Sequence, residues 1–205
     1  MKFCANVLFE DNHILAVDKP AGMLTQSAGQ ESGLEDLLRQ NYRYLHCVHR
    51  IDAPVSGIVI FAKSSKGLSR MSESLKEGKW TKIYRARVEG KLKGASTLEH
   101  RLVHGDHRAE IAPDGKVAKL NYRVLQSDEA SLVEIELLTG RYHQIRAQFA
   151  AIGHPIIGDT KYGAATKAAR GKGTIDLHHT QVNLPHPTLK SDIEIKALMP
   201  QMLRL

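Results

Sequence analysis

The sequence HRIDAPVSG, residues 49–57, is followed at once by the apolar run IVIFA, residues 58–62. Such a run is typical of a buried strand, and a loop at the end of a buried strand often presents catalytic side chains. Asp52 lies in this loop, close to Arg50 and before a turn that contains Pro54. The structural alternative is a turn aspartate, since Asp is common in turns that contain Ser and Gly. We treat Asp52 as a candidate catalytic carboxylate.

A second segment, TGRYHQIRAQFAAIG at residues 139–153, combines cationic and apolar positions. Its apolar residues recur at i, i+4 and i+7, which predicts a short helix over residues 143–152. We expect His143 and Arg146 to share the other face, at the helix N-terminus, where an anion would bind. Arg146 suits a carboxylate or a phosphate equally well. A solvated basic helix face is the alternative.

Together, the two segments resemble the signature motifs of the RluA-type pseudouridine synthases. The resemblance covers nearly the whole chain and keeps the family's order. Its other parts are an opening strand pair with a Lys-Pro-x-Gly turn, a Lys-x-Tyr strand, a Gly-Asp motif and a closing segment, found at residues 7–22, 82–88, 153–159 and 177–187. The sequence departs from the family at Ile51, at residues 53–55 and at Tyr142. These departures are expected to affect which RNA is recognised.

The resemblance implies an isomerase that detaches uracil from ribose at N1 and rejoins it through C5, without a cofactor or a metal. Asp52 is then the catalytic carboxylate, either as a nucleophile towards the sugar or by assisting a glycal intermediate. Arg146 is the candidate partner of that carboxylate. Tyr84 is the candidate that stacks on the target base and accepts the C5 proton. The base must leave its stack to react, and Arg50 is a candidate to fill the vacated space.

The partner implied is RNA, ribosomal or transfer. The 205-residue chain has a formal net charge of +7, which favours a polyanion. Basic residues concentrate between 63 and 93, and again in a glycine- and alanine-rich stretch at 161–173 that is typical of a surface loop. A plain flexible connection is the alternative for that stretch. The expected RNA or base contacts are Arg50, His49, Arg141, His143, Lys82, Lys161, Lys167, Arg170 and Lys172.

The pattern of apolar and alternating runs predicts an α+β fold, with a mixed, largely antiparallel β-sheet core and flanking helices. This agrees with the pseudouridine synthase fold that the resemblance implies. Helices are expected at residues 33–39, 67–77 and 143–152. Strands are expected at residues 7–10, 14–18, 57–62, 81–88, 117–125, 131–138, 182–184 and 193–198. We expect one catalytic domain over residues 1–205 and no separate S4-like domain, so that the catalytic domain itself would hold the RNA.

Other chemistries receive little support from the sequence. The residues His100, His104 and His107 fit no zinc-ligand spacing and are expected in a polar hairpin, so no metal site is predicted. There is no G-x-S-x-G elbow, no P-loop and no Rossmann glycine fingerprint. The chain has no apolar stretch of about 20 residues that would span a membrane. Two cysteines without a CxxC pair favour a reduced, cytoplasmic setting, and we expect a monomer.

Two alternative functions remain open at this point. A catalytically silent RNA-binding or RNA-folding factor would use the same basic surface and would tolerate the loss of Asp52. A nucleoside N-glycosidase would share the carboxylate but would have little use for the basic surface. The presence of Asp52, Tyr84 and Arg146 in one chain favours the pseudouridine synthase.

Overall fold

The computed structural model describes residues 6–169, 171 and 173–204, which form two compact units. Unit 1 contains the residues up to Thr81 together with His179–Leu198, and unit 2 contains Lys82–His178 and the residues from Met199 onward. Strand β10 (Leu177–Pro185) begins in unit 2 and continues into unit 1. Whether the chain acts as a single catalytic domain stays a prediction.

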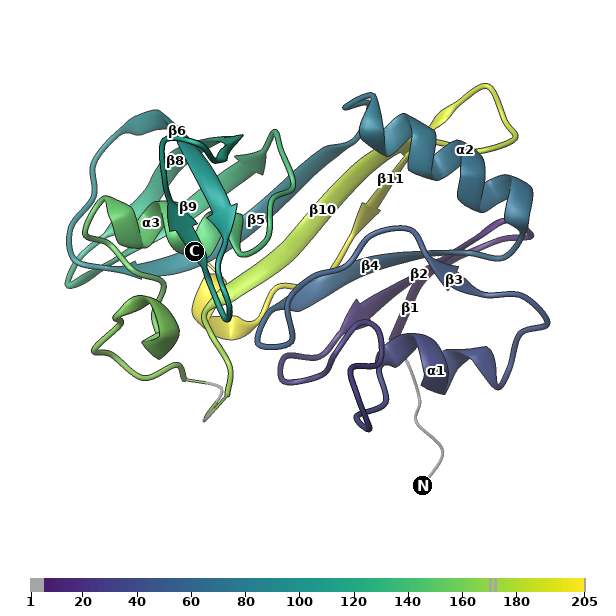
Figure 1. Cartoon of the computed structure of the whole chain (residues 1–205), viewed down its shortest axis with the longest axis horizontal. Coiled ribbons are helices and arrows are strands. Elements are labelled where there is room, and N and C mark those ends of the chain that lie inside the picture. Colours follow the sequence, from purple (N-terminus) through teal and green to yellow (C-terminus); the bar gives the residue numbers. More distant parts are fainter. Residues whose placement is uncertain (1–5, 170, 172, 205) are drawn as a thin grey trace. The chain divides into compact units, whose positions relative to one another are not determined.

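Unit 1 is built on strands that pair mostly antiparallel, together with two helices (Figure 1). Its strands lie in the order β1-β2-β4-β10, while β3 pairs with β4 and β11 pairs with β10. Its other elements are β1 (Asn6–Glu10), β2 (Ile14–Lys19), α1 (Leu34–Arg39), β3 (His46–Cys47), β4 (Ser56–Ala62), α2 (Ser65–Lys76) and β11 (Asp192–Lys196). All seven residues of β4 are buried, so the apolar run after Asp52 is a central strand as predicted.

Helix α2 begins two residues before the predicted range of 67–77 and ends one residue before its end. The Ser64 side chain accepts a hydrogen bond from the amide of Gly67 at 3.1 Å, which caps the N-terminus. Met71 is fully buried in a cluster with Ile58 and Ile60 of β4, so this face of the helix packs on the strands of unit 1. Burial of a methionine of this kind stabilises the fold by about 1.5–3 kcal/mol relative to exposure.

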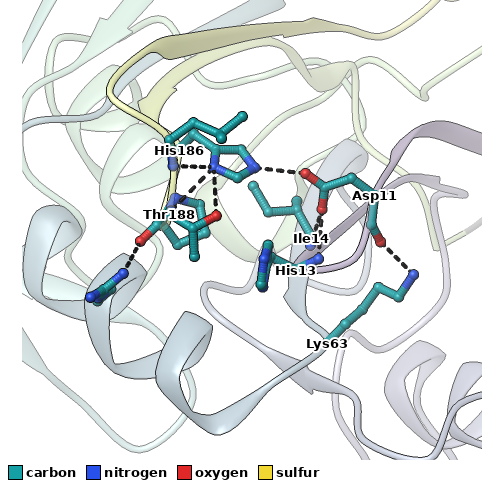
Figure 2. Close-up of polar contacts among 9 residues, drawn as sticks. Asp11, His13, Ile14, Lys63, His186 and Thr188 are labelled. Atoms are coloured by element: carbon teal, nitrogen blue, oxygen red, sulfur yellow. Dashed lines mark hydrogen bonds and ion pairs between the residues drawn. The ribbon is translucent and has the colours of Figure 1, made fainter.

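A histidine–carboxylate contact joins two turns of unit 1 (Figure 2). His186 Nδ1 accepts hydrogen bonds from the amides of Thr188 (3.2 Å) and Leu189 (2.9 Å), so its Nε2 carries the proton and donates it to Asp11 Oδ2 at 2.6 Å. The other Asp11 oxygen accepts from the amide of Ile14 at 2.7 Å. Burial opposes ionisation of Asp11, but these hydrogen bonds outweigh it and lower its pKa. The contact ties the β1–β2 turn to the β10–β11 turn.

Unit 2 is an antiparallel arrangement in the order β5-β9-β8-β6-β7 (Figure 1). Its elements are β5 (Thr81–Glu89), β6 (Ala95–His104), β7 (Ala109–Ile111), β8 (Lys116–Ser127), β9 (Ala130–Leu137), α3 (Gln144–Ala151) and the 3-10 turns η1 (Thr160–Tyr162) and η2 (Gln201–Leu203). Helix α3 packs its Ala147 against Leu102, Ala109 and Ala118 of the strands.

The expected α+β class with a mixed, largely antiparallel sheet is confirmed. Strands β6 and β7 were not predicted, because most of their side chains are exposed and they carry no apolar run. The polar hairpin expected around His104 and His107 is confirmed as the β6–β7 turn. Among the described residues, no helix has the length and apolar character needed to cross a bilayer.

Candidate active site

Asp52 is half-buried in the loop that enters β4. The backbone of this loop is fixed at both ends of the aspartate. The amide of Val55 donates to the carbonyl of Asp52 at 3.0 Å, closing a turn. On the other side, Thr25 Oγ1 donates to the carbonyl of Ile51 at 2.8 Å and accepts from the Ile51 amide at 3.3 Å. The carboxylate therefore projects from a backbone with little freedom to move.

The same loop is anchored by Lys19, whose side chain is fully buried. Its ammonium group donates to the carbonyls of Pro20 (3.0 Å), Met23 (2.6 Å) and Ala53 (3.2 Å). A buried charge is tolerated only where hydrogen bonds replace its hydration. These carbonyls belong both to the Lys-Pro-x-Gly turn and to the Asp52 loop, so Lys19 holds the two segments together. The sequence placed Lys19 in a turn motif but gave no signal of this contact.

Gly57, the second residue of β4, meets the neighbouring strand at very short range. Its φ is +113°, and a Cβ at this position would lie 2.3 Å from the carbonyl oxygen of His179 in β10. Only glycine fits this approach without a shift of the backbone. The Ser-Gly pair after Asp52 is thus explained by strand packing.

The two residues before Ile51 have different surroundings. His49 is half-buried, accepts a hydrogen bond at Nε2 from the Ile60 amide (3.3 Å) and packs edge-on against Trp80 and His179. This is the environment of a packing residue, and a contact of His49 with RNA stays a prediction. Arg50 is exposed and is therefore accessible to RNA. Its role in filling the space vacated by the base stays a prediction.

In unit 2, Tyr84 lies in β5 opposite Ile135 of β9 and is 6% exposed. Lys82, two residues earlier, is half-buried, and burial lowers its pKa. The Lys-x-Tyr strand is therefore observed as predicted, and the roles of its residues stay predictions.

Helix α3 differs from the amphipathic helix that was predicted. It covers Gln144–Ala151, and residues 144–149 are all buried, so the alternative of a solvated basic face is wrong. Arg146 is 4% exposed and forms a bidentate ion pair with Asp159. Its Nε donates to Oδ2 at 2.6 Å, and its Nη2 donates to Oδ1 at 2.9 Å. The sequence gave no indication that Asp159 would be this partner, although it lies in the Gly-Asp motif of the resemblance.

His143 precedes α3 in the left-handed region, at φ 50°, and is the one non-glycine residue with a positive φ within the described part of the chain. Its side chain is buried, with Nδ1 3.1 Å from the hydroxyl of Tyr162. Burial lowers the pKa of His143 to about 3, and the charges of Arg146 and Lys161 act in the same direction. His143 is therefore neutral at physiological pH.

The remaining predicted RNA contacts lie in unit 2. Arg141 is exposed and donates from Nε to the carbonyl of Val117 at 3.0 Å. Lys161 is exposed and donates to the carbonyl of His107 at 3.0 Å. Lys167 is also exposed. Arg170 and Lys172 lie outside the described residues. Of the predicted site, Asp52, Arg50 and His49 belong to unit 1, whereas Tyr84, Arg146 and the other described contacts belong to unit 2.

Comparison with known protein families gives one match over most of the chain. A family model described as RNA pseudouridylate synthase matches residues 13–151. The chain is 33% identical over 210 residues to an uncharacterized RNA pseudouridine synthase, YhcT, of Bacillus subtilis, covering 95% of this chain and 68% of the relative. It is 32% identical over 216 residues to the ribosomal large subunit pseudouridine synthase C of Escherichia coli, covering 97% and 67%. The chain thus spans about two thirds of the length of these relatives.

Solved structures resemble the fold. The human RNA pseudouridylate synthase domain containing 1 superposes with a TM-score of 0.83 at 23% identity, covering 98% of this chain and 86% of that chain. The human RNA pseudouridylate synthase domain containing 4 superposes with a TM-score of 0.78 at 22% identity, covering 97% and 90%. At this level of identity the similarity shows the pseudouridine synthase fold alone.

Proposed function

This chain belongs to the RNA pseudouridylate synthase family, whose members are isomerases, and we propose that it converts uridine to pseudouridine in a structured RNA, with Asp52 as the catalytic carboxylate. In this reaction the bond between N1 of uracil and C1′ of ribose breaks. A bond between C5 and C1′ replaces it, and the proton on C5 is lost while N1 gains one. No atom is exchanged with another substrate, so the reaction balances without a redox partner.

The observation that carries this proposal is the fixed loop around Asp52. A carboxylate that attacks C1′, or that assists a glycal intermediate, must meet the sugar in one geometry, because a misplacement of about 1 Å can cost roughly 100-fold in rate. The contacts of Lys19 and Thr25 on the adjacent carbonyls supply that rigidity. The resemblance implies that Tyr84 stacks on the target base and accepts the C5 proton. It also implies that Arg146 pairs with the catalytic carboxylate. Both assignments remain predictions.

For the substrate, we infer a large-subunit ribosomal RNA rather than a transfer RNA. The support is the printed function of the Escherichia coli and Vibrio vulnificus relatives, which are ribosomal large subunit pseudouridine synthases. The net charge of +7 suits either RNA and does not discriminate between them. A cytoplasmic location and a monomeric state are further expectations.

The decisive experiment maps pseudouridine at single-nucleotide resolution in RNA from a strain lacking this protein. The strain is rescued with the wild type, with Asp52→Asn, or with the matched control Asp114→Asn at an exposed turn. We expect a discrete site to disappear in the deletion strain and to return with the wild type and the control only. If Asp52→Asn restores the site, Asp52 is not catalytic. If no site changes in the deletion strain, a non-catalytic RNA-binding factor replaces the proposal.

A further inference from the structure

Three aromatic rings of unit 2 are stacked on one another. The ring of Tyr142 lies 3.8 Å from that of His143, with 20° between the planes, and 4.2 Å from that of His104, with 31° between the planes. Two rings cannot both lie at about 4 Å over one face of a third, so the two histidines flank Tyr142. Exposure rises along the stack, from the buried His143 through the half-buried Tyr142 to the exposed His104.

The buried end of this stack is held rigidly. His143 occupies the left-handed region, a conformation that costs about 1–2 kcal/mol in a non-glycine residue and persists only where the surroundings enforce it. The hydroxyl of Tyr162 lies 3.1 Å from His143 Nδ1 and accepts a hydrogen bond from the amide of Ala109 at 2.7 Å. Tyr162 therefore joins the start of α3 to β7, the strand that follows the turn after His104.

We propose that the stack of His104, Tyr142 and His143 is a docking platform for a nucleobase of single-stranded RNA, which extends the stack at His104. The inference rests on the proposed function in one respect, which is that the ligand is an RNA. Unpaired bases are recognised in RNA chiefly by stacking on aromatic side chains. A rigid platform binds well, because its side chains lose little conformational freedom when the base docks.

The charges near the stack suit the phosphates of such a strand. Arg141 and Lys161 are both exposed, and each donates one described hydrogen bond to a backbone carbonyl. A guanidinium or ammonium group has further N–H donors for a phosphate. On the β6–β7 hairpin, Arg108 pairs with Glu110 at 3.1 Å, and Asp106 is exposed. These five side chains comprise three cations and two anions, so their net formal charge is +1.

The test separates stacking from charge by comparing two fluorescent oligomers. One is a short single-stranded RNA of mixed sequence, and the other is a ribose-phosphate oligomer of equal length without bases. We expect His104→Ala and Tyr142→Leu each to weaken binding of the RNA by roughly 5- to 150-fold, the range typical of a base stacked on an aromatic ring. Binding of the abasic oligomer should not change. Tyr142→Phe keeps the ring and should bind RNA like the wild type.

Arg141→Ala serves as the charge control and should weaken both oligomers by a similar factor. Circular dichroism checks that each variant is folded, and His104→Ala is secure in this respect because the residue is exposed. If His104→Ala and Tyr142→Leu bind RNA like the wild type, or weaken both oligomers alike, the platform is refuted. Binding involves no chemistry, so this assay can fail or succeed separately from the isomerisation reaction. A wild type that binds RNA through the stack but forms no pseudouridine refutes the function and leaves the platform intact.

Discussion

Arg146 and Asp159 form a two-pronged ion pair inside unit 2, with 2.6 Å between Nε and Oδ2 and 2.9 Å between Nη2 and Oδ1. Both side chains are almost completely buried. The pair fixes the plane of the guanidinium and thereby decides in which direction its Nη1 points. Asp159 is thus a residue that orients the Arg146 side chain.

Asp159→Asn should destabilise the protein by about 3–5 kcal/mol, because it removes the negative charge that compensates a buried guanidinium. Urea unfolding followed by circular dichroism measures this change. The matched control is Glu110→Gln, which removes the carboxylate from an exposed pair with Arg108 and should cost about 1 kcal/mol or less. Equal losses in the two variants would contradict the role given to Asp159.

Lys19→Met should lower both stability and the rate of pseudouridine formation. The substitution keeps much of the side-chain volume but leaves the carbonyls of Pro20, Met23 and Ala53 without the ammonium that they share, at a cost of about 2–5 kcal/mol. The measurements are the free energy of unfolding and kcat on the mapped RNA. Lys196→Met, at an exposed lysine, is the control and should change neither. A fully active Lys19→Met variant would show that the Asp52 loop needs no such anchor.

Gly57→Ala should be strongly destabilising, because the new Cβ would lie 2.3 Å from the carbonyl oxygen of His179. The strands must separate to relieve this overlap, and we expect a loss of about 2–4 kcal/mol, observed as a lower Tm. Gly78→Ala separates the steric overlap from the strain of a positive φ. Gly78 also has a positive φ, of 72°, but has open space around its Cβ position. Its cost should be about 1 kcal/mol. Similar Tm values for the two variants would exclude the steric explanation.

Cys47 should be chemically inert in the folded protein. Burial and the adjacent Glu35 carboxylate raise its pKa to about 12, and only the thiolate reacts with alkylating reagents. In a Cys4→Ser background, iodoacetamide at pH 8 should leave Cys47 unmodified in the native state and should alkylate it in urea. Mass spectrometry of the peptide measures both. Rapid alkylation of the native protein would contradict this placement of the thiol.

His143 should remain neutral down to about pH 3 and should make folding sensitive to acid. Its pKa is about 3 in the folded state and about 6.5 when unfolded, so the unfolded chain binds its proton first. The contribution to stability is complete above pH 6.5 and is lost as the pH falls from there towards 3. Unfolding free energies of the wild type and His143→Gln between pH 4 and 8 test this. The difference between the two proteins should shrink as the pH falls, and a constant difference would contradict the lowered pKa.

The local features of the site could be predicted from the sequence. An unbroken apolar run after Asp52 specifies a buried strand, because a strand covered on both faces has no solvated positions. The Ser64 cap at the start of α2 is likewise a local feature, since a capping hydroxyl acts on amides only a few residues away. Fold class and family followed from motifs in a fixed order along the chain. All of these depend on residues that are close in sequence.

What the sequence could not supply are partners that are distant along the chain. Nothing in the order of residues indicates that Lys19 would bind the carbonyl of Ala53, or that Asp159 would form a bidentate ion pair with Arg146. The solvated helix face considered for Arg146 is wrong for the same reason, because strands of unit 2 cover the helix. The sequence by itself determined the family, most of the strands and the candidate residues. Tertiary structure alone decided which buried charges meet, because that depends on how the segments pack in three dimensions.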